Sequence, residues 1–310
     1  MVGSILTWAF VACAGFGLSV VASRWAVEHA AKLAYGLSVP PFILGVVFFA
    51  VGTDVPEIAN SVMSSLAGHG DLNVGDSVGS VIVQITLVLG ILPFAGGKFA
   101  VGRFRAAIVP LLTLLALAFG ILLVADGRLS RLDGVLLALG WVAATMVAWR
   151  YAPPNSEAEL PVPDHHKALH AFVAFASLLL VAAGAGAAVK AMVELSTRAG
   201  IPEYLISFFG SSVGTSLPEL VVTIVALRQG QRDIALGDIF GACLIDSTLS
   251  IGAGPLVAPT AVTASLAVRG AGVAIGAVLL AGLILWGRRR HDRLSGAILL
   301  AMYGAAYLLM

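Results

Sequence analysis

Charged residues are scarce in this sequence of 310 residues. They make up 11% of the chain, whereas about a quarter is usual for a soluble domain. Hydrophobic residues make up 59%, and apolar runs of about 18 residues or more recur along the whole length, which is typical of membrane-spanning helices. The formal net charge of +1 indicates neither a nucleic acid nor an acidic partner. We therefore predict an all-α polytopic membrane protein that contacts the lipid bilayer and has no obligate protein partner.

Cysteine is also rare, since Cys13 and Cys243 are the only two and both lie in apolar segments. This excludes a disulfide framework and a zinc site, and we interpret both residues as buried, inert thiols. The first segment, residues 1–23, lacks the basic region of a secretory signal peptide, and its apolar run is too long for one. We interpret it as the first membrane span.

Hydropathy divides the chain into ten segments that are long enough to cross a bilayer as helices. They are residues 3–23, 39–67, 74–97, 105–125, 130–150, 169–195, 201–228, 235–258, 266–286 and 293–310. The only clearly polar linker, residues 151–168, is rich in proline and acidic side chains and lies at the middle of the chain. We expect it to be a cytoplasmic hinge between two five-helix halves, residues 1–150 and 169–310.

The basic residues are distributed unevenly between the two ends of these helices. If the N-terminus is outside, 13 of the 18 Lys and Arg residues fall on the cytoplasmic side. The five that remain outside are Arg128, Arg131, Lys190, Arg198 and Arg269. The positive-inside rule therefore favours extracellular or periplasmic positions for both termini. The compact length favours the plasma (inner) membrane of a prokaryote.

The two halves contain an internal repeat. Residues 51–93 align without a gap on residues 213–255, at an offset of 162, with 14 identities in 43 positions. Most of the identical residues are Gly, Pro, Thr or acidic, which the apolar composition does not explain. An odd number of spans separates the copies, so they enter the membrane from opposite sides. Inverted repeats of this kind are typical of secondary transporters, whose substrate site lies near the bilayer midplane.

Each copy contains the motif Gly-Thr-x-x-Pro-Glu, at residues 52–57 and 214–219. Proline frees backbone carbonyls in the preceding turn, and such carbonyls are tolerated at membrane depth only where something satisfies them. An ionised carboxylate there costs about 2.5–3.5 kcal/mol on insertion scales. Glu57 and Glu219, with the hydroxyls of Thr53 and Thr215 and the freed carbonyls, would supply the 6–8 oxygens that Ca2+ takes. The alternative is a pair of kinked packing helices whose glutamates form hydrogen bonds.

A Gly-Asp-x-x-Gly helix follows in each copy, with a polar face of residues spaced four apart. The faces consist of Asp76, Ser80 and Gln84 in the first copy and Asp238, Ala242 and Asp246 in the second. We expect the deeper Gln84 and Asp246 to line the site. Asp76 and Asp238 are interpreted either as helix caps or as entrance residues, and Asp71 and Asp233 as N-caps.

The glycines of this second element follow the small-xxx-small pattern that lets membrane helices approach closely. They are Gly75, Gly79, Gly237 and Gly241. We expect all four to serve helix packing.

These segments resemble the α-1 and α-2 repeats of the Ca2+/cation antiporter superfamily, and most closely those of the prokaryotic sodium/calcium exchangers. Ten helices, external termini and a central cytoplasmic loop also match that family. The resemblance implies that Glu57 and Glu219 coordinate Ca2+ and that Thr53 and Thr215 contribute oxygens. The residue after each threonine is a Ser that serves Na+ in the family. The second copy keeps it as Ser216, whereas the first has Asp54.

Two departures from the family pattern bear on the counter-ion. Ser80 is retained, but the equivalent Ala242 lacks a hydroxyl that the family uses for Na+. Asp54 adds a carboxylate, so the candidate site holds four, at Asp54, Glu57, Glu219 and Asp246. Four crowded carboxylates cannot all be ionised without a cation. We expect one or two of them to be protonated when Ca2+ is bound.

The favoured function is an antiporter that exchanges Ca2+ for Na+ and has no cofactor. Exchange of Ca2+ or another divalent cation for protons is the alternative. A cation channel would arrange acidic residues in rings around a symmetric oligomer. An intramembrane aspartyl protease is remote, because Leu236-Gly237-Asp238 resembles its Gly-x-Gly-Asp motif only in part, with Ala235 in place of the first glycine. An HExxH motif is absent, and we expect no enzymatic activity.

Overall fold

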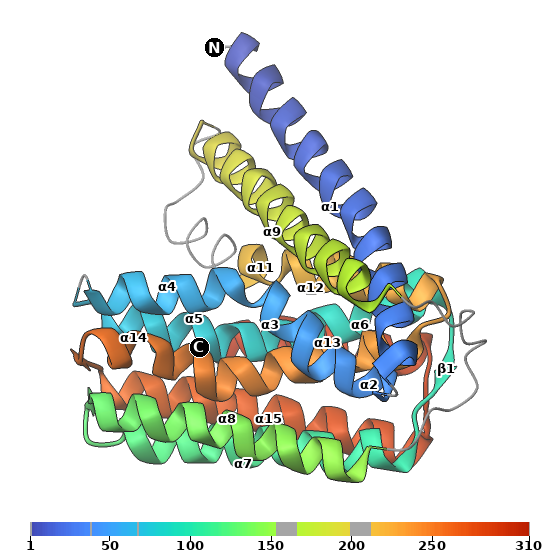
Figure 1. Ribbon diagram of the computed structural model, residues 1–310. Helices are drawn as coiled ribbons and strands as arrows, with labels where there is room; N and C mark the ends of the chain where they lie inside the picture. The colour runs from blue at the N-terminus through green and yellow to red at the C-terminus, as the bar shows by residue number, and fades with distance from the viewer. Residues whose placement is uncertain (1, 38, 67, 153–165, 199–211, 310) are drawn as a thin grey trace.

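The computed structural model describes residues 2–37, 39–66, 68–152, 166–198 and 212–309, and Figure 1 shows that helices dominate them. The first half contains α1 (Val2–Leu37), α2 (Pro41–Leu44), η1 (Gly45–Phe49), α3 (Ala50–Thr53), α4 (Val55–Leu66), α5 (Gly70–Ile82), η2 (Val83–Val88), α6 (Leu89–Gly96), β1 (Phe99–Ala100), α7 (Arg103–Val124), β2 (Arg128–Leu129) and α8 (Arg131–Tyr151). The second half contains α9 (Lys167–Arg198), α11 (Ser212–Thr215), α12 (Leu217–Arg228), α13 (Arg232–Ile245), η3 (Asp246–Ser250), α14 (Ile251–Val257), β3 (Thr260–Ala261), α15 (Ala264–Arg288), β4 (Arg290–His291) and α16 (Arg293–Leu309).

A helix, or a succession of helices, coincides with each of the ten segments expected from hydropathy. Most of the central linker and the start of the seventh segment, residues 153–165 and 199–211, lie outside the described residues. Within the described part, six helices are long and apolar enough to cross a membrane. The segment that carries the first Pro-Glu motif is absent from these six because a helix break divides it into shorter pieces, and the start of the segment that carries the second lies outside the described residues. The chain is a helical membrane protein.

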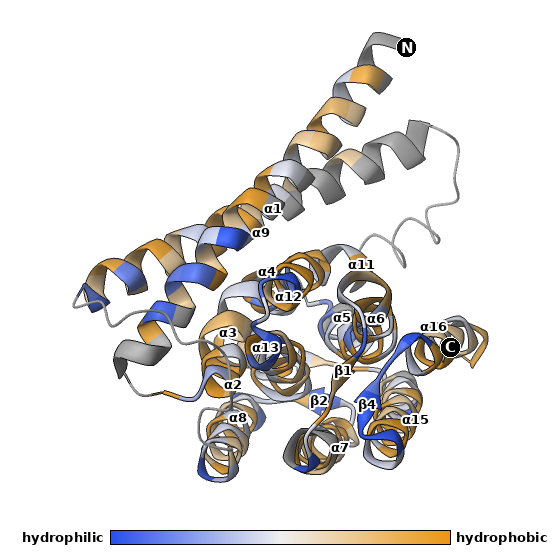
Figure 2. Cartoon of the chain, turned by 90° about the vertical axis from the view of Figure 1, so that its right-hand side faces the viewer, coloured by the Kyte–Doolittle hydropathy of each residue, from blue (hydrophilic) through white to orange (hydrophobic). Residues whose placement is uncertain are grey.

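The helices form a bundle across which a separate pair lies obliquely. Figure 2 views most of the bundle end-on, with α1 and α9 packed side by side across it. Within this pair the Ser19 hydroxyl donates to the Val181 carbonyl at 3.0 Å, and the two residues are 162 positions apart. The offset that relates the two sequence copies therefore also relates positions that meet in α1 and α9.

The two helices that follow the Pro-Glu motifs form the centre of the bundle. Residues Ile234 to Ile245 of α13 are all buried, and most of the succession α5, η2 and α6 is enclosed as well. A membrane helix that is surrounded by protein can carry polar side chains that lipid does not accommodate. This position explains how the Gly-Asp-x-x-Gly segments carry so many polar residues.

Close packing of α13 depends on its glycines. A Cβ atom at Gly237 would meet the Phe42 backbone, and one at Gly241 would meet the Val46 backbone. Gly79 likewise faces the side chain of Ser212, which confirms a packing role for three of the four glycines. Gly75 has open space around it, so the expectation of close packing there is wrong.

Two short antiparallel sheets join the halves of the chain. β1 pairs with β4, with Phe99 opposite His291, and β2 pairs with β3, with Leu129 opposite Thr260. β1 precedes α7 and β2 follows it, so the sheets lie at opposite ends of this helix. β4 is displaced from β2 by 162 residues, which repeats the offset of the sequence copies.

Two smaller expectations are corrected. Cys243 is buried as expected, but Cys13 is exposed, because it lies on a face of α1 that no other described element covers. Asp71 lies in the first turn of α5 and does not act as its N-cap, which is His69, and Asp233 likewise lies in the first turn of α13, whose N-cap is Gln231. The Asp71 carboxylate instead accepts hydrogen bonds from the Thr263 N–H (2.5 Å) and hydroxyl (2.7 Å). It thereby links α5 to the segment before α15.

The glycine contacts predict unequal effects at two equivalent positions. Gly237→Ala should destabilise the protein by about 1–3 kcal/mol, because the new methyl group overpacks against α2. Gly75→Ala should be neutral or stabilising by up to about 1 kcal/mol, because alanine favours the helix and meets no neighbour. Thermal unfolding of the detergent-solubilised variants measures both changes, and equal losses of stability at both positions would contradict this packing.

Candidate cation-binding site

Two helix breaks of the same shape carry the acidic motifs. Asp54 lies between α3 and α4 with φ −81° and ψ 6°, and Ser216 lies between α11 and α12 with φ −81° and ψ 7°. Both breaks fall two residues before the motif proline, where the missing N–H and the steric clash were expected to interrupt the helix. Glu57 and Glu219 then stand in the first turns of α4 and α12, where the positive end of the helix dipole favours a carboxylate.

The breaks bring three acidic side chains together. One carboxylate oxygen from each of Asp54, Glu57 and Glu219 lies within 4.8 Å of the other two, and all three residues are buried. Oxygens on opposite sides of a Ca2+ ion lie about 5 Å apart, since each Ca–O bond is about 2.3–2.6 Å long. The spacing of these oxygens therefore suits a single Ca2+ ion.

The three carboxylates form no ion pair with a basic side chain within the described part of the chain. None of their six oxygens accepts a hydrogen bond there, and the ion pairs found in that part involve other residues. Removing one partner from a buried ion pair costs about 3–5 kcal/mol, because the remaining charge is uncompensated. A cluster of unpartnered carboxylates is therefore stable only with protons or cations bound to it.

Two π-helical turns position the next pair of polar side chains. Gln84 lies in η2 and Asp246 in η3, and π-turns are frequent at functional sites because they alter the direction of side chains. The Gln84 Nε2 atom donates to Asp246 Oδ2 at 2.9 Å, across an offset of 162 residues. Gln84 Oε1 and Asp246 Oδ1 have no partner among the described residues. Asp246 lies within electrostatic range of both Asp54 and Glu57, so the fourth carboxylate belongs to the same acidic group.

The expected hydroxyl groups lie in or beside the helix breaks and the central helices. Thr53 is buried, and its hydroxyl donates to the Phe49 carbonyl at 3.1 Å. Ser80 and Ser216 are buried with no hydrogen-bond partner for their hydroxyl oxygens within the described chain. Thr215 is half-buried at the end of α11. The unpartnered serine oxygens are available to a cation.

Asp76 and Asp238 are not helix caps, because both lie within their helices and are buried. Asp238 accepts a hydrogen bond from the Thr223 hydroxyl at 3.0 Å, and the Thr53 hydroxyl, which also contacts the Phe49 carbonyl, lies 3.4 Å from Asp238 Oδ1. Asp238, in the second half of the chain, therefore contacts Thr53, a site residue in the first half.

Two residues that bind these aspartates were missed by the sequence analysis. Asn60 donates to Asp76 at 2.7 Å, and Thr223 donates to Asp238. Asn60 lies three residues after Glu57, and Thr223 lies four residues after Glu219. These are the spacings that place polar residues on one helix face, and that signal could have identified them.

A family model described as sodium/calcium exchanger protein matches residues 6–150 and 169–310. The putative antiporter CaxA of Alkalimonas amylolytica is 33% identical over 300 residues, which cover 91% of this chain and 92% of that protein. The inner membrane protein YrbG of Escherichia coli is 30% identical over 256 residues, which cover 79% of this chain and 78% of that protein. A solved structure of the sodium-calcium exchanger NCX_Mj superposes with a TM-score of 0.82 at 24% identity, covering 99% of both chains.

The carboxylate cluster predicts a loss of Ca2+ affinity in two variants. Glu57→Gln and Glu219→Gln each replace a negatively charged ligand of the buried cation by a neutral amide, which costs about 2–5 kcal/mol of binding free energy. The dissociation constant should therefore rise about 30-fold or more, as measured by calorimetric titration of the purified protein in Na+-free buffer. Glu28→Gln is the matched control, because Glu28 is exposed and paired with Lys32. Wild-type affinity in either site variant would contradict the assignment.

The contact between Asp238 and Thr53 predicts coupled effects. Asp238→Asn should weaken Ca2+ binding about 10- to 100-fold, which is usual when a group that orients a metal ligand is lost. Adding Thr53→Val to this variant should weaken binding less than it does in the wild type, because both changes disrupt one interaction. The same titration applied to the double-mutant cycle measures the coupling, and additive losses would show that Asp238 does not act through Thr53.

Proposed function

Because the chain belongs to the sodium/calcium exchanger family, we propose that it is a secondary-active antiporter that exchanges Ca2+ for Na+ by alternating access. The observation that carries this proposal is the cluster of three buried, unpartnered carboxylates at two helix breaks from opposite halves of the chain. The negative charge of this cluster favours antiport, because the site needs a bound cation in each direction of transport. Without a cation, the cluster would leave unpaired charge at membrane depth, which is costly. The protein would therefore switch readily between its inward-facing and outward-facing states only when Ca2+ or the counter-ions neutralise the site.

The proposed ligands of Ca2+ are the carboxylates of Glu57 and Glu219 and the oxygens of Thr53 and Thr215. A second set would bind the counter-ion or complete the coordination shell: Asp54, Ser216, Ser80, Gln84 and Asp246. The helix breaks support the first set, since the ends of α3 and α11 offer free backbone carbonyls beside the carboxylates. The unpartnered oxygens of Ser80, Ser216 and Gln84 support the second.

We also propose ten membrane-spanning helices arranged as two inverted five-helix repeats, residues 1–150 and 169–310. Several pairs of equivalent features at an offset of 162 residues support this arrangement. They are the breaks at Asp54 and Ser216, the bonded pair Gln84 and Asp246, and the strands β2 and β4. Both termini would be extracellular or periplasmic, and residues 151–168 cytoplasmic, in the plasma (inner) membrane of a prokaryote. The distribution of basic residues supports this orientation.

A second candidate is the exchange of Ca2+, or of another divalent cation, for protons. Asp54 favours it, because this position holds a carboxylate where the equivalent position holds the hydroxyl of Ser216. Ala242 also favours it, since the equivalent of Ser80 has no hydroxyl for Na+.

The proposed transport requires no bond-breaking step and no cofactor, so we expect no enzymatic activity. Asp238 would be the aspartate of a protease-like motif, yet its carboxylate already accepts a hydrogen bond from Thr223 and contacts Thr53. That contact favours a structural task for Asp238 over peptide hydrolysis.

Ca2+ uptake into proteoliposomes separates the two candidate counter-ions. With the membrane potential clamped by ionophores, an outward Na+ gradient should drive uptake of radioactive Ca2+, and a proton gradient should not. Glu57→Gln and Glu219→Gln should abolish uptake. Asp54→Ser gives the first helix break the residue found in the second. If uptake is driven only by protons and is lost in this variant, the counter-ion is H+ and not Na+. Dissipation of either gradient without coupled Ca2+ movement would contradict antiport.

Reporter fusions test the proposed orientation. Alkaline phosphatase fused after residue 310 should be active and green fluorescent protein fused there should be dark, because the C-terminus is expected outside. Fusions within residues 151–168 should behave in the opposite way. Reversal of this pattern at both positions would invert the assigned topology.

A further inference from the structure

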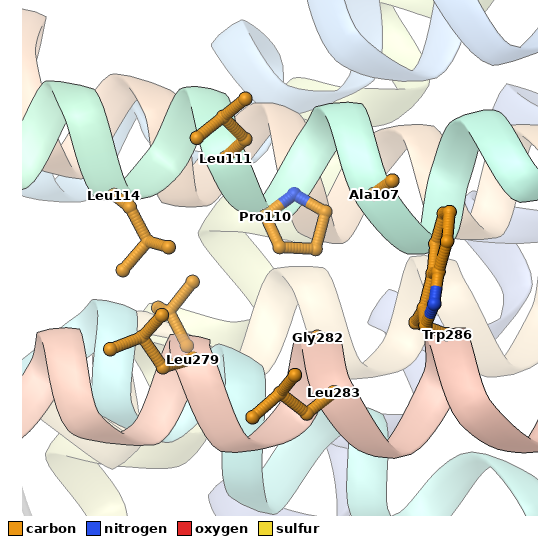
Figure 3. A pocket seen from close by; sticks show the side chains of 9 residues that line it. Ala107, Pro110, Leu111, Leu114, Leu279, Gly282, Leu283 and Trp286 are labelled. Carbon is orange, nitrogen blue, oxygen red and sulfur yellow. The ribbon is translucent and has the colours of Figure 1, made fainter.

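An apolar groove lies on the surface of the bundle between α7 and α15. It has a volume of about 320 Å³, and Figure 3 shows its walls, with Leu111 and Pro110 on α7 and Leu279 and Leu283 on α15. Gly282 packs closely against Pro110, because a Cβ atom there would lie 3.1 Å from the Pro110 Cβ, so α7 and α15 are in close contact between the larger residues that line the groove. Both helices are long and apolar enough to span the membrane, so the bilayer surrounds this groove.

Trp286 lines one end of the groove, where a group of basic residues begins. Pairing of β1 with β4 places Ala100 opposite Arg290, and Val101 donates its N–H to the Arg289 carbonyl at 3.1 Å. These bonds bring the start of α7 and the end of α15 together. Figure 2 shows the hydrophilic β4 at this end of the bundle. Basic side chains from both halves therefore gather at one end of an apolar groove.

Three of these basic residues have no acidic partner within the described chain. Arg288 and Arg290 form ion pairs with Asp292, at 2.6 Å and 3.1 Å. Lys98, Arg103 and Arg289 are exposed and form no ion pair there. The Arg289 guanidinium lies 5.6 Å from the centre of the Trp286 ring, which directs one of the three cations toward the groove.

We propose that this groove binds an anionic phospholipid. One acyl chain occupies the apolar space between Pro110 and Leu283, and the headgroup phosphate meets Lys98, Arg103 and Arg289. Tryptophan is enriched where membrane proteins meet the headgroup layer, and basic pockets between spanning helices bind anionic headgroups. The unpaired cations favour an anionic lipid over a zwitterionic one. They also disfavour a second copy of this chain, because two equivalent basic clusters would repel each other.

The full-length protein in detergent, titrated with phosphatidylglycerol or phosphatidylcholine, provides the test. Phosphatidylglycerol should raise the unfolding midpoint more than phosphatidylcholine does, and native mass spectrometry should detect its retention. Combining Lys98→Gln, Arg103→Gln and Arg289→Gln should weaken phosphatidylglycerol binding about fivefold for each charge removed. The matched control combines Arg128→Gln, Arg131→Gln and Arg269→Gln, at the other end of α7 and α15, and should bind as the wild type does.

A second variant tests the apolar part without changing any charge. Leu283→Trp should fill the groove and reduce phosphatidylglycerol retention, whereas Leu139→Trp, at an exposed position of α8, should not. Equal binding of both lipids, or equal losses in the two charge variants, would overturn anionic recognition at this site. A dimer in the mass spectrum that Leu283→Trp dissociates would show instead that a second copy covers the groove.

Discussion

The constraint on which this structure depends is the cost of an unpartnered carboxylate inside a membrane. Asp54, Glu57 and Glu219 approach one another without an ion pair to a basic side chain in the described part of the chain. The surrounding elements explain how this is sustained. The helix breaks present a helix start to each glutamate, and the glycines of α13 exclude lipid by drawing α2 and η1 onto it. What remains is a site that is stable only with cations or protons bound.

The two halves share a backbone plan but not a set of side chains. Both breaks have nearly the same φ and ψ, yet one carries Asp54 and the other Ser216. In the central helices, Gln84 faces Asp246 through a single hydrogen bond. A site built from equivalent positions can therefore hold unequal ligands. In the exchange that we propose, Ca2+ coordination would depend on the glutamates that both copies keep, and the choice of counter-ion would depend on positions at which the copies differ.

The sequence predicted what local chemistry determines, and it failed where packing decides. Pro56 and Pro218 located both helix breaks, because the missing N–H acts within one turn. The π-turns at Gln84 and Asp246 were not predicted, since they depend on how the central helices pack against their neighbours. Asp238 was misread for the same reason, because its partner Thr53 lies 185 residues away. Nor could hydropathy tell that the lipid-facing side of α1 includes Cys13.

The central claim is that one Ca2+ ion binds between the two helix breaks, and a crystal structure of the Ca2+-loaded protein tests it most directly. Anomalous scattering locates the ion independently of the refined chain. The account predicts a single strong peak about 2.3–2.6 Å from carboxylate oxygens of both Glu57 and Glu219. A Ca2+ peak that contacts only one of these glutamates, or a fully Ca2+-loaded crystal whose peak lies elsewhere, would contradict it.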